Sequence, residues 1–156
     1  MNTKKTLQTA VSLLAPYTQT TNQPADNRVD VMVDVGKLVT AVYTLHESNW
    51  GYLAAITGLD LGVEAGEMEV LYHFCAGAAV VTLRVKVERN EAIVPTICPI
   101  IPSASFFERE LSEMLGIIIA GAAISDHLFL PDNWPIGVYP LRKDFQPQVI
   151  QNQAGK

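Results

Sequence analysis

Two neighbouring segments with apolar residues at every second position constrain the fold of this chain more than any other part of its sequence. In residues 78–89 the apolar positions are Val81, Leu83, Val85 and Val87, and the polar positions between them are Thr82, Arg84, Lys86 and Glu88. Alternation of this kind is typical of a β-strand that buries one face. Residues 67–77 come directly before, and the Ala-Gly-Ala sequence at the junction supplies a turn. The two segments therefore predict a β-hairpin.

Apolar residues at helical spacing predict two helices in the first fifty residues. Leucine and valine recur every three to four positions over 4–15, which predicts a short amphipathic helix that Pro16 stops. The same spacing over 37–49 predicts a second helix, with His46 on its exposed side. We interpret His46, and His73 in the hairpin, as structural residues.

The other segments of the chain alternate between extended and irregular patterns. Residues 28–35 alternate valine with other residues and predict a half-buried strand, and residues 51–62 predict a strand that leads into a turn with glycine. Residues 18–27 are polar and predict a loop. Residues 91–103 contain Pro95, Pro99 and Pro102 and predict an extended connector. This order of elements predicts an α+β fold: a mainly antiparallel sheet, helices on one face, and an irregular C-terminal segment.

Composition restricts the kinds of partner. The 156 residues favour one domain, and an apolar share of 49% indicates a large core or an apolar surface that a partner covers. Eleven basic and sixteen acidic residues give a net charge of -5, and the basic residues are scattered. Nucleic acid and anionic membranes both require clustered lysine and arginine, so neither is expected as the main ligand.

The cysteines and the apolar segments argue against a metal site or a membrane span. Cys75 and Cys98 form no Cys-x-x-Cys motif and histidine is scarce, so a zinc or iron–sulfur site held by this chain alone is not expected. We expect two reduced, partly buried thiols. The most apolar run, 114–124, is shorter than the roughly 20 residues that a transmembrane helix needs. No signal peptide is expected in the first twenty residues.

The sequence SASFFERELSEMLGI, residues 103–117, predicts a third helix with charges at its centre. Ser103 is expected to cap a helix that begins at Ala104 and ends before Gly116. The expected apolar face holds Ala104, Phe107, Leu111, Met114 and Leu115, and the expected solvated face holds Glu108, Arg109, Ser112 and Glu113.

The adjacent charges Glu108, Arg109 and Glu110 allow three interpretations. In the first interpretation the charges form a solvated helix face, and the only interaction expected is an ion pair between Arg109 and Glu113, which lies four residues further along the helix. As catalytic carboxylates, Glu108 and Glu110 are unsuitable, because about 200° of helix rotation separates them and they could not flank one substrate. As the polar seam of a protein–protein contact, they would explain Glu110, which lies at the edge of the apolar face where a charge needs a partner.

Asp126 and His127 are the remaining candidates for acid–base chemistry. An Asp–His couple can form a base, but it requires a nucleophile or a metal, and neither Cys75 nor Cys98 lies in an obvious nucleophile setting. The sequence has no G-x-S-x-G motif, P-loop or G-x-G-x-x-G motif. A small stand-alone enzyme would have to bring Glu110, Asp126 and His127 into one concave pocket.

Three motifs then follow one another along the chain: FFERELSEMLGI (106–117), LFLPDNW (128–134) and PLRKDF (140–145). In this order they resemble the signature of the 30 kDa subunit family of respiratory complex I (NADH dehydrogenase), which includes the matching subunits of membrane-bound energy-converting hydrogenases. The resemblance is strongest over residues 106–145, and residues 94–104 look like the middle portion of the family.

The resemblance implies a docking subunit with no redox cofactor and no catalytic residue of its own. It implies one domain over residues 1–145, a polar tail over 146–156, and a place in the cytoplasmic arm of a complex at the inner cell membrane. The implied partners are the large catalytic subunit, which carries the quinone or nickel site, and the small iron–sulfur subunit; the membrane is reached only through them. The implied interface residues are Glu108, Arg109, Glu110, Glu113, Trp134, Arg142, Lys143 and Asp144.

The sequence departs from the common pattern of this family at three places, one of which is Glu113, where aspartate is common. The other two separate it from the complex I branch. Residues 121–127 read GAAISDH where that branch has Gly-His-Pro followed by an arginine pair, and the spacer between Trp134 and Pro140 is slightly longer. Both departures leave the electron donor and acceptor open between an NADH–quinone enzyme and a hydrogenase. A free adaptor that kept the docking surface without the complex is a further alternative.

Overall fold

The computed structural model describes residues 2–122 and 127–147 of the chain. Its helices are α1 (Thr3–Leu14), α2 (Leu38–Glu47) and α3 (Ala104–Leu115), with short 3₁₀ helices η1 (Ala15–Tyr17) and η2 (Val35–Lys37). Its strands are β1 (Thr18–Ala25), β2 (Arg28–Val33), β3 (Tyr52–Asp60), β4 (Glu67–Ala76), β5 (Ala79–Glu88), β6 (Ile93–Pro95) and β7 (Ile118–Ala120).

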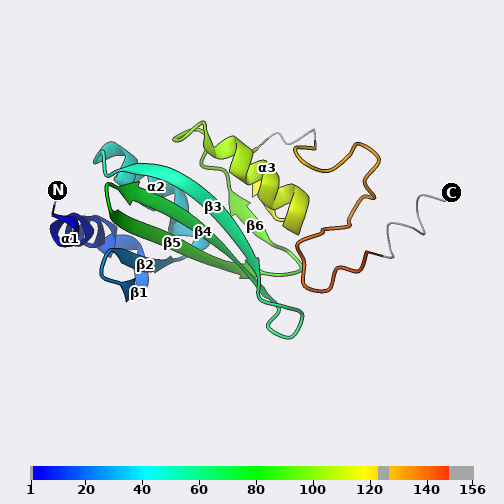
Figure 1. Cartoon of the computed structure of the whole chain (residues 1–156), viewed down its shortest axis with the longest axis horizontal. Coiled ribbons are helices and arrows are strands. Elements are labelled where there is room, and N and C mark those ends of the chain that lie inside the picture. The colour runs from blue at the N-terminus through cyan, green and yellow to red at the C-terminus, as the bar shows by residue number, and fades with distance from the viewer. Residues whose placement is uncertain (1, 123–126, 148–156) are drawn as a thin grey trace.

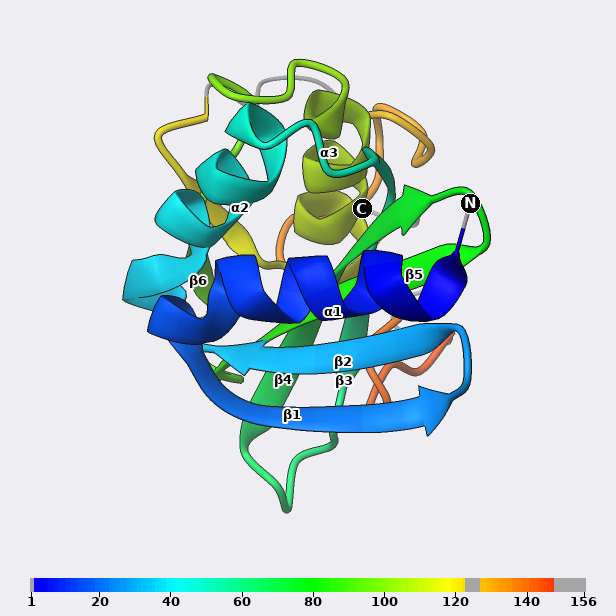
Figure 2. The same ribbon diagram turned by 90° about the vertical axis from the view of Figure 1, so that its left-hand side faces the viewer.

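Five of these strands form one sheet in the order β1-β2-β5-β4-β3. The pairings are antiparallel except between β2 and β5, which run parallel. Figure 1 shows α3 beside β3, the strand at one edge of this sheet, and Figure 2 shows α1 running alongside β2. The helices pack their buried residues into a single core on one face of the sheet. The predicted α+β class, with a mainly antiparallel sheet and helices on one face, is therefore confirmed.

The predicted hairpin is the centre of the structure. β4 and β5 pair over their full length, and Gly77 occupies the tight turn between Ala76 and Ala79 with a positive φ of 60°. A residue without a side chain adopts this conformation at little cost, which explains the glycine at this position.

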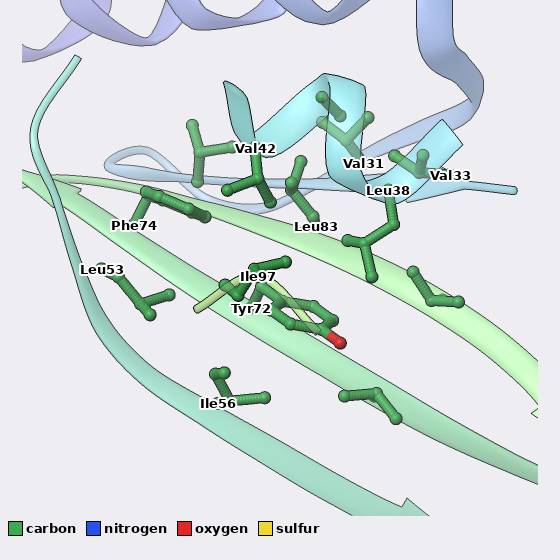
Figure 3. Close-up of a cluster of buried hydrophobic side chains, with 14 of the residues drawn as sticks. Val31, Val33, Leu38, Val42, Leu53, Ile56, Tyr72, Phe74, Leu83 and Ile97 are labelled. Atoms are coloured by element: carbon green, nitrogen blue, oxygen red, sulfur yellow. The ribbon is translucent and has the colours of Figure 1, made fainter. Parts of the chain in front are cut away.

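Alternate residues of the hairpin supply the largest part of the core. Val70, Tyr72 and Phe74 of β4 lie opposite Val85, Leu83 and Val81 of β5, and all six are buried. Figure 3 shows side chains of β2, α2 and the connector after β6 meeting this layer. Full burial of one such side chain stabilises the fold by about 1.5–3 kcal/mol. The two-residue periodicity of the sequence is thus the direct cause of this packing.

The prediction of a loop over residues 18–27 is wrong, because most of this segment is strand β1. β1 forms an antiparallel hairpin with β2, with Asp26 and Asn27 at the turn. It lies at the edge of the sheet and nearly all of its side chains are exposed, so it carries no apolar periodicity that could have indicated a strand. Pro24 is compatible with this position, because an edge strand does not need every backbone N–H.

Two predictions around the proline-rich connector also need correction. Residues 93–95 form β6, which pairs in parallel with β7 at residues 118–120, so the connector is not merely extended. Pro95 is the last residue of β6. Its missing N–H therefore does not interrupt the hydrogen bonds of a longer strand pair. Ser103 makes no side-chain capping bond to α3; the N–H of Ala104 instead donates to the carbonyl of Ile101, which satisfies the helix start by a backbone turn.

α3 approaches the sheet directly over Gly58 of β3. A Cβ atom at this glycine would lie 2.2 Å from Cδ1 of Leu115 and 2.8 Å from Cδ2 of Leu111. Both leucines are buried in the core, so they have little room to move. The glycine therefore sets the distance between α3 and the sheet.

Replacing Gly58 by valine should separate α3 from β3. We expect the free energy of unfolding to fall by about 1–3 kcal/mol, which is typical of an overpacked core. Urea denaturation followed by circular dichroism measures the change. The matched control is Ala54→Val on the same strand, an exposed position where we expect a change within about 0.5 kcal/mol. Equal effects at both positions would contradict this account of Gly58.

Candidate functional site

Glu108 is a buried carboxylate rather than part of a solvated helix face. Only 2% of the residue is exposed, and its carboxylate accepts hydrogen bonds from the Thr96 hydroxyl (2.7 Å), the Ile97 backbone N–H (2.7 Å) and the Cys98 thiol (3.0 Å). The predicted solvated position of Glu108 is wrong, because the segment after β6 crosses this side of α3 and supplies three donors. Those donors replace the water that burial removes. Glu108 therefore holds residues 96–98 against α3.

Cys98 is held by the same carboxylate and does not act as a free surface thiol. Burial raises the pKa of its thiol, and the hydrogen bond to Glu108 adds to this effect. A thiol with a raised pKa is a poor nucleophile at neutral pH. Cys75 and Cys98 are both unpaired and partly buried, as expected from the sequence.

Glu113, one turn further along α3 from Arg109, organises the segment that follows residue 126. Its side chain is 5% exposed, and its carboxylate accepts the backbone N–H groups of Leu128, Phe129 and Leu130 at 2.7–3.1 Å. Burial alone would raise the pKa of Glu113, but these N–H donors and His127 outweigh it, so the pKa is lowered. The prediction that Glu113 lies on a solvated face is also wrong.

The remaining predicted residues of α3 are half-buried. Nη2 of Arg109 donates to the backbone carbonyl of His127 at 3.2 Å, so Arg109 also contacts the segment that Glu113 holds. Glu110 faces another way and lies with Met114 beside residues 55–58 of β3.

A second buried carboxylate, Asp60, joins the end of β3 to the C-terminal segment. Arg89 forms a two-pronged ion pair with Asp60 at 2.8 and 2.9 Å, and it also donates to Asp144. The backbone N–H of Lys143 donates to the same Asp60 carboxylate at 2.8 Å. The hydrogen bond from Arg89 lowers the pKa of Asp60 far below its usual range and lowers that of Asp144 as well. Residues 143 and 144 are therefore fixed to the sheet.

The C-terminal segment is further attached to the end of α3. Nε of Arg142 donates to the carbonyl of Leu115 at 2.8 Å, and its guanidinium lies over the ring of Tyr139, 4.7 Å from the centroid. The indole N–H of Trp134 donates to the carbonyl of Val138 at 2.7 Å. In Figure 1 this segment, coloured orange to red, passes beside α3. The three motifs singled out in the sequence thus form one continuous region.

Sequence reasoning missed Asp60 and Arg89. Both lie at ends of strands, and both are almost fully buried, at 7% and 5% exposed. No local pattern relates them, because 29 positions separate them in the chain. An arginine directly after an alternating strand was the only signal, and by itself it indicates a surface residue.

The structure does not bring the candidate catalytic residues together. His127 lines a hollow with Arg109 and Trp134, and its Nδ1 is bonded to Glu113 at 3.0 Å. Glu110 lines a different hollow beside β3. Asp126 lies outside the described residues. Over residues 2–122 and 127–147, no group of histidine, cysteine and acidic residues could hold a metal, and none of the helices there has the length and apolar character of a membrane span.

Comparison with known proteins defines the family. Residues 31–150 match the family described as the 30 kDa subunit of respiratory-chain NADH dehydrogenase, so the chain belongs to this family. The corresponding NADH-quinone oxidoreductase subunit of Rhodopseudomonas palustris strain TIE-1 is 32% identical over 142 residues, which cover 88% of this chain and 68% of the relative. Formate hydrogenlyase subunit 5 of Escherichia coli K12 is 34% identical over 121 residues, 76% of this chain.

The match to the hydrogenlyase protein extends over only part of that relative. The aligned region is 21% of its length, so the chain corresponds to about a fifth of the larger relative. Among solved structures, a chain from the membrane-bound sulfane sulfur reductase, an archaeal respiratory membrane complex, superimposes with a TM-score of 0.80. It covers 96% of this chain and 91% of its own, at 24% identity, which shows a shared fold.

Truncating Glu108 should leave the donors of Thr96 and Ile97 buried without an acceptor. We expect Glu108→Ala to lower the free energy of unfolding by about 2–3 kcal/mol, because unsatisfied buried donors cost about 1–3 kcal/mol each. Alkylation of Cys98 should also become faster. The matched control is Glu110→Ala, two residues away, which should change stability by no more than about 0.5 kcal/mol. A neutral result for Glu108→Ala would show that the carboxylate is not needed to hold residues 96–98.

The lowered pKa values of Asp60, Glu113 and Asp144 predict loss of stability in acid. A carboxyl group whose pKa is lower in the folded than in the unfolded state stabilises the fold at any pH above its unfolded pKa of about 4. This stabilisation is lost as the pH falls through the pKa of the folded state. Urea midpoints should therefore decrease as pH falls below about 4. Asp60→Asn should cost up to about 3 kcal/mol at pH 7 and flatten this decrease. The exposed Asp26→Asn variant, measured over the same pH range, should behave like the unmodified chain.

Proposed function

We propose that this chain is a docking subunit, without catalytic residues or cofactors of its own, in the peripheral arm of a complex I-like NADH:quinone oxidoreductase or a related energy-converting hydrogenase. Its role is to support the large catalytic subunit during electron transfer. Membership of the 30 kDa subunit family supports this proposal. So do the names of its relatives, which are subunits of oxidoreductases and hydrogenases.

The observation that carries the proposal is the way in which the charged motifs are used. Glu108, Glu113 and Asp60 all point into the chain, where they hold three segments in place. Apolar side chains are exposed in and between the two held segments of the C-terminal region: Phe129 is 62% exposed, Ile136 102% and Leu141 58%. A fixed, exposed apolar surface is typical of a site that binds another protein.

The predicted interface residues then fall into two groups. Glu108, Glu113 and Arg142 position the surface from within, because their charged groups are bonded to the chain's own backbone. Glu110, Trp134 and Lys143 form the second group, which we assign to the contact with a partner. Asp144 and Arg109 belong to both groups, because Asp144 also pairs with Arg89 and Arg109 also bonds the carbonyl of His127. Arginine and carboxylate pairs at the margin of a contact give it its specificity.

The proposed partners are the large catalytic subunit and the small iron–sulfur subunit of the same complex. The chain would reach the inner cell membrane only through them and would bind no nucleic acid. Residues 1–145 would act as one domain, and residues 146–156, most of which lie outside the described residues, as a polar extension.

A pull-down of this chain from native membranes tests the proposal. We expect large redox subunits in the eluate, which is then analysed for metals and flavin. Nickel with iron would assign the chain to an energy-converting hydrogenase, and flavin and iron without nickel would assign it to an NADH-type dehydrogenase. A cofactor-free protein with no large partner would contradict the subunit role.

Reversing the charge of Lys143 should weaken this association. The residue is exposed while its backbone N–H is bonded to Asp60, so Lys143→Glu should leave the fold intact and reduce the recovered partner several-fold, as expected for loss of a charge contact worth about 1 kcal/mol. The matched control is Lys37→Glu, another exposed lysine, located next to α2 and far along the chain from the motifs. Equal losses for both variants would argue against a contact at Lys143.

A further inference from the structure

The two edges of the five-stranded sheet differ in how they are protected. β1, at one edge, is polar, contains Pro24 and has two register irregularities against β2. These features are common devices that prevent an edge strand from pairing with another chain. β3, at the other edge, has one irregularity near its start and then pairs regularly with β4 over residues 55–60. That part of β3 contains neither proline nor lysine.

Alternate residues of β3, among them Ile56 and Gly58, direct their backbone groups away from the neighbouring strand. The N–H of Leu61 donates to the carbonyl of Glu67, its register partner, which fixes the phase of the β3–β4 ladder. Because hydrogen-bonded and non-hydrogen-bonded pairs alternate along an antiparallel ladder, Ile56 and Gly58 belong to the pairs whose N–H and C=O groups face outward. β3 has no strand on that side within the described part of the chain. The edge therefore offers donors and acceptors to an added strand at these two positions.

A groove runs along this free edge. It lies between residues 55–58 of β3 and the stripe of α3 formed by Phe107, Glu110 and Met114, and Leu141 of the C-terminal segment lies at one end. Its volume of about 250 Å³ is below the 300–1,000 Å³ typical of small-molecule pockets, so an inserted side chain suits it better than a ligand. Its lining is apolar except for Glu110 and Thr57.

We propose that an extended segment of the large partner subunit pairs with the edge of β3 at Ile56 and Gly58. One apolar side chain of that segment enters the groove between Phe107, Met114 and Leu141. A lysine or arginine two residues away faces Glu110. This spacing follows because alternate residues of a strand point to the same face, and both contacts lie on the α3 side. The backbone bonds supply affinity and the two side chains supply specificity.

This inference rests on the proposed function, because it assigns the docking contact to a particular element of the chain. Charge complementarity selects the occupant: Glu110 lies at the groove, and a basic residue matches it. If a second copy of this chain were the occupant, β3 would pair with β3 and two Glu110 side chains would lie close to the same groove. The repulsion between these like charges disfavours that arrangement.

Hydrogen exchange on the complex isolated from native membranes tests the pairing. In the free chain, the amides of Ile56 and Gly58 should exchange faster than those of Thr57 and Leu59, which are bonded to β4. In the complex, exchange at Ile56 and Gly58 should slow at least about tenfold, while the outer edge of β1 stays unchanged. Unchanged exchange at β3 within an intact complex would overturn the inference and leave the subunit role standing. The inference would also be overturned if exchange at Ile56 and Gly58 slowed in the free chain as its concentration was raised. That result would indicate a second copy of the chain as the occupant.

Charge reversal provides an independent test of the side-chain contact. Glu110→Lys should reduce the partner recovered in the pull-down several-fold and restore fast exchange at Ile56 and Gly58 in any complex that forms. Glu64→Lys makes the same charge change at an exposed position outside the groove and should alter neither readout. Full recovery and full protection with Glu110→Lys would overturn the assignment of Glu110.

Discussion

Buried carboxylates that accept hydrogen bonds from irregular backbone are the interaction on which the C-terminal half of this structure depends. Residues 96–98 and 127–130 have no repeating ladder of their own, so their backbone N–H groups need other acceptors. Glu108 of α3 accepts the N–H of Ile97, and Glu113 accepts those of Leu128, Phe129 and Leu130. A carboxylate that loses water is costly unless several donors replace it, and each of these glutamates receives at least three. One helix thereby fixes two segments that could not fix themselves.

The Asp60–Arg89 pair extends the same arrangement to the sheet. An ion pair buried in this way adds little net stability, because desolvation offsets most of the attraction. Its value is positional: Asp60 accepts from the backbone N–H of Lys143, and Arg89 also binds Asp144, so residues 143 and 144 are held at the end of the sheet. The carboxylates of Glu108, Glu113 and Asp60 therefore act inside the protein, while apolar side chains such as Phe129 and Leu141 are exposed nearby.

This division of roles suits a protein that belongs to a family of complex subunits. The core made by β4, β5 and the helices supports α3, the edge of β3 and the C-terminal segment, which we propose as the contact with a partner. Fold alone would not assign a function. Here Glu110 and His127 lie in separate hollows, and the exposed side chains of Phe129 and Ile136 are of the apolar kind that protein contacts use.

The sequence by itself determined the hairpin, the helices and the end of α3 at Gly116, because periodicity and a left-handed helix terminus are local properties. It also determined the family, through three motifs in a fixed order. It could not determine that polar residues 18–25 form a strand, since an exposed edge strand takes its structure from the neighbour that it pairs with. Nor could it place Glu108 and Glu113 inside the protein. Helical spacing puts them on a polar face, and only the tertiary structure decides that this face is covered by backbone donors from segments distant in the sequence.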